Sequence, residues 1–147
     1  DPEMLAGHWK WHGGVLHANG NLYGCPCNSE HVLKIEPNTA KVTLVGGPFP
    51  GKQKWYGSLL GGDGCMYCIP NCAGAVLKFD PVTETHELLG DFPEGGWKWH
   101  GAAVGGDGNI YGVAAHVNAI LKIVVPTGQS SLLQISLGPR VFVPSLC

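Results

Sequence analysis

The fold is decided by the stretch KWHGGVLHANGNLYGC at residues 10–25, because the chain presents it three times in one register. The second copy reads KWYGSLLGGDGCMYCI at residues 54–69, and the third reads KWHGAAVGGDGNIYGV at residues 98–113. Each copy starts 44 residues after the one before it. The positions that carry the same residue in all three copies include Trp11, Trp55 and Trp99; Gly13, Gly57 and Gly101; Tyr23, Tyr67 and Tyr111; Leu33, Leu77 and Leu121; and Lys34, Lys78 and Lys122. A period of this length indicates an architecture of stacked repeats.

One repeat contains four short segments with the pattern and the turn residues of antiparallel strands. In the first copy, the segments predicted as strands are residues 11–17, 21–25, 31–35 and 41–45. Asn19 and Gly20 separate the first two segments, and Asn-Gly between apolar runs is a strong signal for a tight hairpin. No stretch between the Gly and Pro residues has a helical period, so each copy is predicted to be a four-stranded antiparallel sheet.

Four strands in about 44 residues are typical of the blade of a β-propeller. The sequence therefore predicts an all-β protein of the β-propeller type, with three four-stranded antiparallel blades of 44 residues that form half or a fragment of a closed ring. A chain of 147 residues is expected to be a single repeat domain, residues 1–147. The predicted boundaries are residues 7–50 for blade 1, 51–94 for blade 2, 95–137 for blade 3 and 138–147 for a C-terminal tail. The alternative is a compact three-bladed fold or a β fold that is not a propeller.

The repeat pattern resembles the blades of known propeller families. It consists of Trp-His-Gly-Gly in the first strand, Asp/Asn-Gly-Asn-Ile-Tyr-Gly across the hairpin, and Val-Leu-Lys-Ile-Asp-Pro-x-Thr across the third strand. Over residues 7–137 it looks like the blades of virginiamycin B lyase and of NHL-like propellers, and still more like KWHGG-type repeat proteins of algae and protists. The resemblance to the lyases implies an active site in which inner-strand His and acidic residues act with Mg²⁺. This chain has matching His residues but no acidic residue beside them, which counts against lyase activity.

Charge and hydropathy narrow the range of partners. Charged residues make up 14% of the chain and the net charge is -2, which gives no reason to expect a nucleic acid or an anionic membrane as partner. No apolar run approaches the ~20 residues that a membrane-spanning helix needs. No signal peptide is visible, and because the chain begins at Asp1 we expect a processed product or a fragment. Nothing in the sequence indicates a compartment.

Three blades leave a propeller ring open, since closed rings usually have four to eight blades. Open blade faces are an aggregation hazard, so we expect a protein partner, a second copy or a longer chain to close the ring. Two copies would form a homodimer with six blades and two-fold symmetry. The repeat departs from its pattern after Ile123, and the end of the chain matches nothing upstream. This end is predicted to be a capping strand that completes a blade, or an altered terminus.

The first strands supply candidate binding residues, because the first strand of a propeller blade lines the central channel. His12, Tyr56 and His100 are equivalent, and each follows one of the tryptophans Trp11, Trp55 and Trp99. Such residues would converge on one axis and could bind a metal or a polar ligand, since neutral imidazole is a common ligand. The alternative is that these residues pack blade on blade, with the His side chains donating to backbone carbonyls.

A second candidate is an aromatic-basic-aromatic element. It reads Trp9-Lys10-Trp11 in the first copy and Trp97-Lys98-Trp99 in the third, and Gln53 replaces the first Trp in the second copy. Strand alternation predicts both Trp side chains on one face and Lys on the other. Exposed Trp pairs stack on sugar rings or bind peptides, whereas buried Trp pairs would fill the wedge between blades.

The remaining polar residues have less specific signals. The cysteines, at positions that are not equivalent in the repeat, are Cys25, Cys27, Cys65, Cys68, Cys72 and Cys147. Their alternatives are buried thiols, a disulfide such as Cys25–Cys68 between neighbouring blades, and a zinc or iron–sulfur site. The turn residues Asn19, Asp63 and Asp107 are explained by hairpin chemistry. The repeated lysines of the third strands are expected to form a solvated stripe that also protects against edge pairing.

These observations favour a binding or scaffold module without catalysis, such as an accessory subunit of a larger assembly, that presents the propeller mouth to a protein or a small ligand. The candidate ligand-binding residues are His12, Tyr56, His100, Trp9, Trp11, Trp55, Trp97 and Trp99. No cofactor is predicted, and no set of metal ligands is identified. The alternatives are a metal-dependent enzyme similar to virginiamycin B lyase, and carbohydrate binding through Trp9, Trp11, Trp97 and Trp99.

Overall fold

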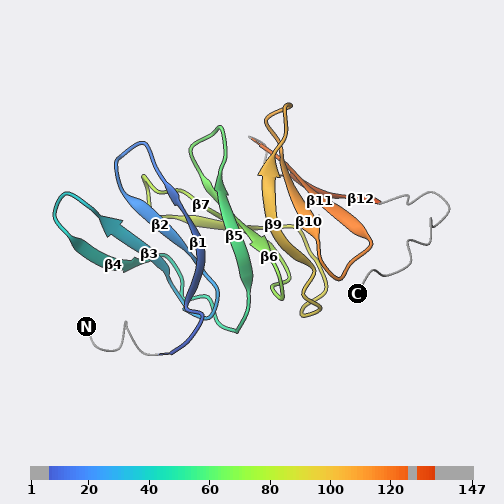
Figure 1. The fold of residues 1–147 in the computed structure, drawn as a ribbon, viewed down its shortest axis with the longest axis horizontal. Coiled ribbons are helices and arrows are strands. Elements are labelled where there is room, and N and C mark those ends of the chain that lie inside the picture. Colours follow the sequence, from blue (N-terminus) through green and yellow to red (C-terminus); the bar gives the residue numbers. More distant parts are fainter. Residues whose placement is uncertain (1–6, 126–128, 135–147) are drawn as a thin grey trace, which may run out of the picture.

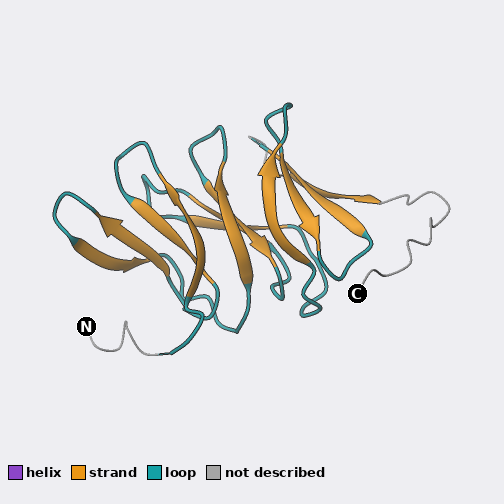
Figure 2. Cartoon of the chain, in the orientation of Figure 1, coloured by secondary structure: helices purple, strands orange, loops and turns teal. Residues whose placement is uncertain are grey.

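The computed structural model describes residues 7–125 and 129–134, which form three four-stranded antiparallel sheets side by side in an arc (Figures 1 and 2). Blade 1 consists of β1 (Trp11–Leu16), β2 (Leu22–Pro26), β3 (Val32–Glu36) and β4 (Lys41–Val45). Blade 2 consists of β5 (Trp55–Leu60), β6 (Met66–Pro70), β7 (Val76–Phe79) and β8 (His86–Leu89). Blade 3 consists of β9 (Trp99–Val104), β10 (Ile110–Ala114), β11 (Ala119–Val124) and β12 (Gln129–Gln134). Within the described ranges there is no helix long and apolar enough to cross a membrane.

Each blade is a meander in which consecutive strands pair. The first strands of the blades, β1, β5 and β9, begin at Trp11, Trp55 and Trp99, so the 44-residue period of the sequence is the period of the structure. The four strands predicted for the first repeat are confirmed, with ends that differ by a residue or two. The all-β fold of β-propeller type is confirmed as well. The predicted tail at 138–147, the end of blade 3 after residue 134, and Cys147 lie outside the described residues.

The blades pack face to face, and the two faces of a blade differ. We call one the Tyr face; in blade 1 it consists of Val15, Tyr23, Cys25 and Val32. The opposite one, the Trp face, consists in blade 1 of Trp11, Leu22, Gly24, Leu33 and Ile35. Equivalent residues, 44 and 88 positions further on, form the same faces of blades 2 and 3.

The core lies between the blades as two clusters. In the first, the Tyr face of blade 1 packs on the Trp face of blade 2, which contributes Trp55, Met66, Cys68, Leu77 and Phe79. In the second, the Tyr face of blade 2, with Tyr67, Ile69 and Val76, packs on the Trp face of blade 3, with Trp99, Ile110, Leu121 and Ile123. Both internal interfaces thus use the same pairing of unlike faces, which explains why most of these positions are apolar in every repeat.

A glycine brings the inner strands unusually close together. Gly13, Gly57 and Gly101 have φ angles of +77°, +82° and +78°, and the pairing of each first strand with the second shifts register at this point. A Cβ atom built on Gly13 would lie 3.1 Å from the Cα atom of Gly57, and one on Gly57 would lie 3.3 Å from the Cα atom of Gly101. The repeated glycine therefore meets two requirements, a left-handed backbone and close strand contact.

We predict that Gly57→Ala destabilises the protein by about 1–2 kcal/mol or more, because an L-residue at this φ is strained and its methyl group would meet the Gly101 backbone. The matched control is Gly62→Ala, since Gly62 lies in the β5–β6 turn with open space around it. Urea unfolding of the three proteins measures the difference. Equal stability of the two variants would contradict this account of the glycine.

Candidate functional site

Side chains from all three blades converge where the first strands approach one another. The ring centroids of His12 and Tyr56 are 4.1 Å apart, those of Tyr56 and His100 are 4.7 Å apart, and those of His12 and His100 are 5.7 Å apart. Trp9 stacks on His12 with a centroid distance of 6.3 Å, and Trp97 stacks on Tyr56 at 5.9 Å. We call these five residues the aromatic collar.

The collar borders an open hollow of about 520 Å³, which Gln53 also lines. Trp9 and Trp97 are 64% and 39% exposed, whereas Tyr56 is only 5% exposed and forms the floor between them. Gln53 occupies the position of Trp9 and Trp97 in the second copy. None of the six residues that line the hollow carries a carboxylate or an ammonium group. The hollow is therefore mainly aromatic, and its other polar groups are an amide and two imidazoles.

The side chains of the Trp-Lys-Trp element do not follow the alternation that the sequence predicted. Trp9, Gln53 and Trp97 have φ angles of 52°, 51° and 48°, in the left-handed region, and they precede the strands rather than belong to them. This turn directs the first aromatic side chain to the collar, while the second Trp packs on the Trp face of its blade. The prediction that both Trp side chains share one face is wrong for this reason.

Two of the three equivalent lysines, Lys54 and Lys98, are buried, whereas Lys10 is partly exposed. Lys54 Nζ donates to the carbonyl oxygens of Cys27 and Ser29 in the preceding blade, at 2.9 Å each, and to that of Gly51 at 3.1 Å. Lys98 Nζ donates to two backbone carbonyls in the same way, at 2.7 and 2.8 Å. Burial lowers the pKa of both lysines. Lys54 therefore holds blade 2 to the β2–β3 loop of blade 1.

Trp11, Trp55 and Trp99 lie apart from the collar. Their indole N–H groups donate to the carbonyl oxygens of residues 31, 75 and 119, at 2.9, 2.8 and 2.8 Å. Trp55 and Trp99 are almost fully buried, and a Phe ring packs edge-on against each of them. Of the eight candidate residues, the structure thus brings together Trp9, His12, Tyr56, Trp97 and His100, and it places the other three between or on the blades.

His12 has the most perturbed environment in the collar. Its Nδ1 atom is buried and has no hydrogen-bond partner in the described structure. Burial lowers the pKa of His12 below its ordinary value of 6.5, and the neighbouring His100 lowers it further. The predicted alternative, in which this His donates to a backbone carbonyl, has no such hydrogen bond at Nδ1.

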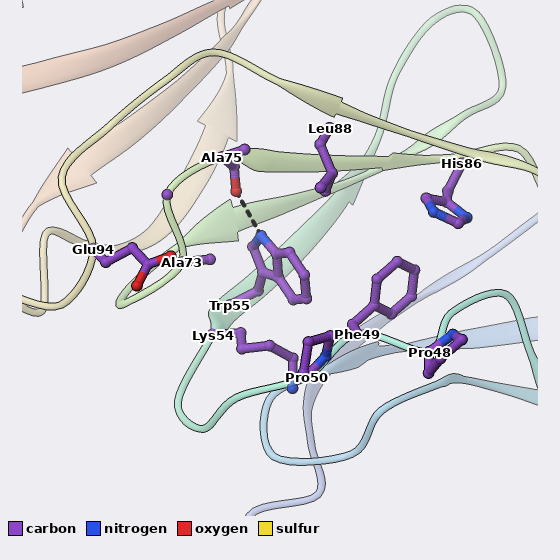
Figure 3. A pocket seen from close by; sticks show the side chains of 11 residues that line it. Pro48, Phe49, Pro50, Lys54, Trp55, Ala73, Ala75, His86, Leu88 and Glu94 are labelled. Carbon is purple, nitrogen blue, oxygen red and sulfur yellow. Dashed lines mark hydrogen bonds between the residues drawn. The ribbon is translucent and has the colours of Figure 1, made fainter.

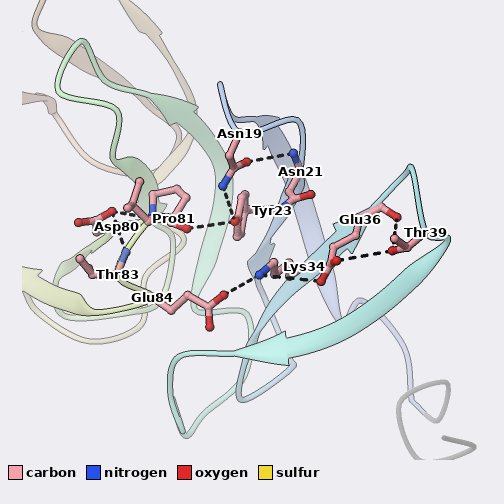
Figure 4. A network of polar contacts seen from close by, with 11 residues as sticks. Asn19, Asn21, Tyr23, Lys34, Glu36, Thr39, Asp80, Pro81, Thr83 and Glu84 are labelled. Carbon is pink, nitrogen blue, oxygen red and sulfur yellow. Dashed lines mark hydrogen bonds and ion pairs between the residues drawn. The ribbon is translucent and has the colours of Figure 1, made fainter.

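The repeated lysines of the third strands do not form a solvated stripe. In blade 1, Lys34 Nζ lies 2.7 Å from the Glu84 carboxylate of blade 2, an ion pair that raises the pKa of Lys34 (Figure 4). The Tyr23 hydroxyl donates to the Pro81 carbonyl oxygen at 3.1 Å, also across the interface, and accepts from Asn19. These contacts join the outer parts of blades 1 and 2.

In blades 2 and 3 the same lysine pairs within its own blade. Lys78 lies 3.2 Å from Asp63 and Lys122 lies 3.6 Å from Asp107, each beside a tyrosine hydroxyl that donates to the same carboxylate. The hydrogen bonds from Tyr111 and Asn109 lower the pKa of Asp107 to about 2. The hairpin role predicted for these aspartates therefore holds, since each accepts a backbone N–H in the turn, but each also neutralises a lysine.

All five cysteines within the described residues are free thiols. Cys25, Cys27 and Cys68 are buried, and Cys25 and Cys68 face each other in the core between blades 1 and 2. Burial, followed by the Cys68 thiol, raises the pKa of Cys25. The described part of the chain contains no group of three or more His, Cys, Asp or Glu side chains that could hold a metal ion.

A second hollow, of about 410 Å³, lies between the blade 1–blade 2 linker and blade 2. Figure 3 shows Trp55 and Phe49 next to each other, with His86 near Phe49 and Leu88 on the same strand as His86. The Phe49 ring lies 5.5 Å from Trp55 and 4.7 Å from His86. Phe49 thus fills the wedge between two blades, so this hollow is the outer end of an interface rather than a place where repeats converge.

Comparison with known proteins places the fold and not the activity. The chain is similar to virginiamycin B lyase from Staphylococcus aureus, with 17% identity and a TM-score of 0.70 over 85% of this chain and 41% of the lyase. A streptogramin B lyase has 20% identity and a TM-score of 0.71 over 86% of this chain and 41% of its own. An auxiliary nutrient binding protein from Bacteroides thetaiotaomicron has 18% identity and a TM-score of 0.56 over 82% and 35%. No family model and no curated protein matches.

The chain spans about two fifths of the length of these lyases. Its three blades are therefore a partial propeller, whose ring would be completed by other copies or by more chain. The similarity to the lyases agrees with the resemblance of the blades in sequence.

Sequence reasoning missed Gln53 as a member of the site. The sequence did contain a signal for it, because Gln53 is equivalent to Trp9 and Trp97 in the repeat. Since both tryptophans line the hollow, the residue at the same position of the second copy lines it as well. The ion pairs of the third strands were also missed. Lys78–Asp63 and Lys122–Asp107 are equivalent pairs, but the first copy has Asn19 at the position of the aspartate, and Lys34 pairs with Glu84 of the next blade instead.

We predict that His12 titrates below pH 6.5, and that His100→Gln raises its pKa without restoring the ordinary value, because burial is the larger cause. A histidine whose pKa is lower in the folded state makes folding less favourable as the pH falls below about 6.5. NMR titration of the imidazole carbons measures the first effect, and thermal unfolding at pH 7.5 and 5 measures the second. His12→Gln should reduce the loss of stability in acid, and a His12 pKa at or above 6.5 would refute the assignment.

Proposed function

We propose that this chain is a non-catalytic binding module whose aromatic collar takes a small neutral ligand with an apolar face. The observation that carries the proposal is the hollow of about 520 Å³, lined by ring side chains from three different blades. Ligand sites are typically concave and largely apolar, with a few polar groups that fix orientation. The volume lies within the common range of about 300–1,000 Å³ for such sites.

The residues of the collar suit a sugar-sized ring. The exposed faces of Trp9 and Trp97 offer apolar planes for stacking, and the Gln53 amide offers both a donor and an acceptor. The imidazoles of His12 and His100 also line the hollow, and such side chains can exchange hydrogen bonds with a ligand hydroxyl. The carbohydrate alternative is therefore retained with Trp9 and Trp97 alone, because Trp11 and Trp99 lie outside the hollow.

The lyase-like alternative has weaker support. The shared fold extends to lyases and to a nutrient-binding protein, so the fold does not choose between catalysis and binding. A metal-dependent reaction would need ligands besides His12 and His100, and the described residues offer no group of three. The proposed role as an accessory subunit rests on the open ring, because the outer faces of blades 1 and 3 could bind a protein partner.

Binding is tested by titrating a broad panel of mono- and oligosaccharides into the protein and recording tryptophan fluorescence, followed by calorimetry on each hit. We predict that Trp97→Ala weakens binding about tenfold or more, because truncation of a central aromatic contact commonly costs about 2 kcal/mol. The matched control is Leu88→Ala, which removes an exposed apolar side chain away from the collar.

Silence across the panel, or a Trp97→Ala variant that binds as well as the parent, would contradict the proposal. Each titration is repeated with Mg²⁺ and with a chelator. Binding or ligand turnover that appears only with Mg²⁺ would favour the lyase-like alternative instead.

A further inference from the structure

We propose that two copies of this chain close a six-bladed ring, in which the Tyr face of blade 3 of each copy packs on the Trp face of blade 1 of the other. The inference concerns the surface that completes the collar, and it does not rest on the ligand proposed above. It follows from a comparison of each position with its equivalents in the three blades, since two such interfaces already exist within the chain.

The Tyr face is buried wherever a blade follows it. In blade 1 its four residues are at most 8% exposed, and in blade 2 the equivalents Tyr67, Ile69 and Val76 are fully buried. In blade 3 no blade follows within the described residues, and Val113 is 54% exposed although it occupies the position of Cys25 and Ile69. The blade 3 residues of this face are Ala103, Tyr111, Val113 and Ile120. An apolar face is thus present where the described residues do not cover it.

On the Trp face, the residues of blade 1 are the more exposed ones, and those of blades 2 and 3 are buried. Met66 and Ile110, at equivalent positions in blades 2 and 3, are fully buried by the blade before them. Leu22, at the same position in blade 1, is 38% exposed. Trp11, Leu33 and Ile35 are also partly exposed there, whereas their equivalents in blades 2 and 3 are buried. Blade 1 therefore presents the surface on which a preceding blade would pack.

The exposed Trp face of blade 1 and the exposed Tyr face of blade 3 lie at opposite ends of the arc (Figure 1). A Tyr face and a Trp face already pack together at both interfaces within the chain, so these two exposed faces are of complementary types. Their union continues an interface that the chain forms internally, so the occupant of each face is a blade of this same type. A second copy supplies both missing partners at once, and two copies have six blades, within the usual range for closed rings.

The two internal interfaces also predict which positions of the two copies would face each other; we call this alignment the register of the interface. Cys25 lies in the core with Cys68 between blades 1 and 2, and a Cβ atom built on Gly112 would lie 3.5 Å from Ile69 between blades 2 and 3. Ile69 is equivalent to Cys25, and Gly112 to Cys68. The same register places Val113 of one copy against Gly24 of the other. It also places His100 beside His12 of the second copy, so that the collar becomes a closed circle.

The first test is the mass in solution by light scattering at low micromolar concentration. We expect twice the 15.5 kDa of one chain. Leu22→Asp and Val113→Asp should each give a folded monomer, because each puts a carboxylate into one side of the interface. Val82→Asp is the matched control, since Val82 is an exposed apolar residue in the β7–β8 turn, outside both faces. Thermal unfolding checks that all variants remain folded.

The second test uses the pair of positions that the register predicts. In a Gly24→Cys, Val113→Cys double variant, oxidised glutathione as the oxidant should link two copies through disulfides that dithiothreitol releases. Each single variant is the control, and it should give no link between copies. The Gly24→Cys change is compatible with the fold, because Cys68 occupies the equivalent position in blade 2.

A clean monomer of the parent chain would overturn the proposal. A ladder of masses that grows with concentration would also overturn it, because unlike faces that pair without closing give open filaments. Ligand binding by a monomeric variant would show that the collar functions without the second copy, so failure of the ring and failure of the proposed binding function are separable.

Discussion

The structure depends on one interaction, the packing of the Tyr face of each blade on the Trp face of the next. A four-stranded antiparallel sheet with two apolar faces cannot bury either face alone, so each blade is stable only between neighbours. The same positions supply the faces in every repeat, which is why the chain has a strict period without insertions. The indole N–H of each face-forming Trp finds a backbone carbonyl in its own blade, so that a large side chain is buried without an unsatisfied donor.

This packing also creates the collar. Close approach of β1, β5 and β9 requires glycine at positions 13, 57 and 101, and the residue just before each glycine is then brought to the axis. That residue is His12, Tyr56 or His100, and the three rings touch because the strands that carry them do. The site is therefore a consequence of the fold, while its chemistry is set by residues that the fold leaves free to vary.

The sequence predicted the features that repeat, namely the strands, the blade spacing and the convergence of His12, Tyr56 and His100. It did not predict those that depend on a single backbone angle or on a partner from another blade. The left-handed residues Trp9 and Trp97 break the alternation on which the strand argument relied. The burial of Lys54 depends on carbonyl oxygens of the preceding blade, which no pattern within one repeat can reveal.

Positions at which the three copies carry different residues show where the copies make different contacts. Cys25 and Cys68 occupy non-equivalent positions because the cores of two blades meet through unlike faces, so these two residues contact each other from different positions of the repeat. The same reasoning applies to the collar. Gln53 stands between two tryptophans at equivalent positions, so one side of the hollow lacks an aromatic wall and offers an amide instead. A ligand that stacks on Trp9 or Trp97 would therefore meet an amide group on that side only, which gives the site a direction that three identical repeats could not provide.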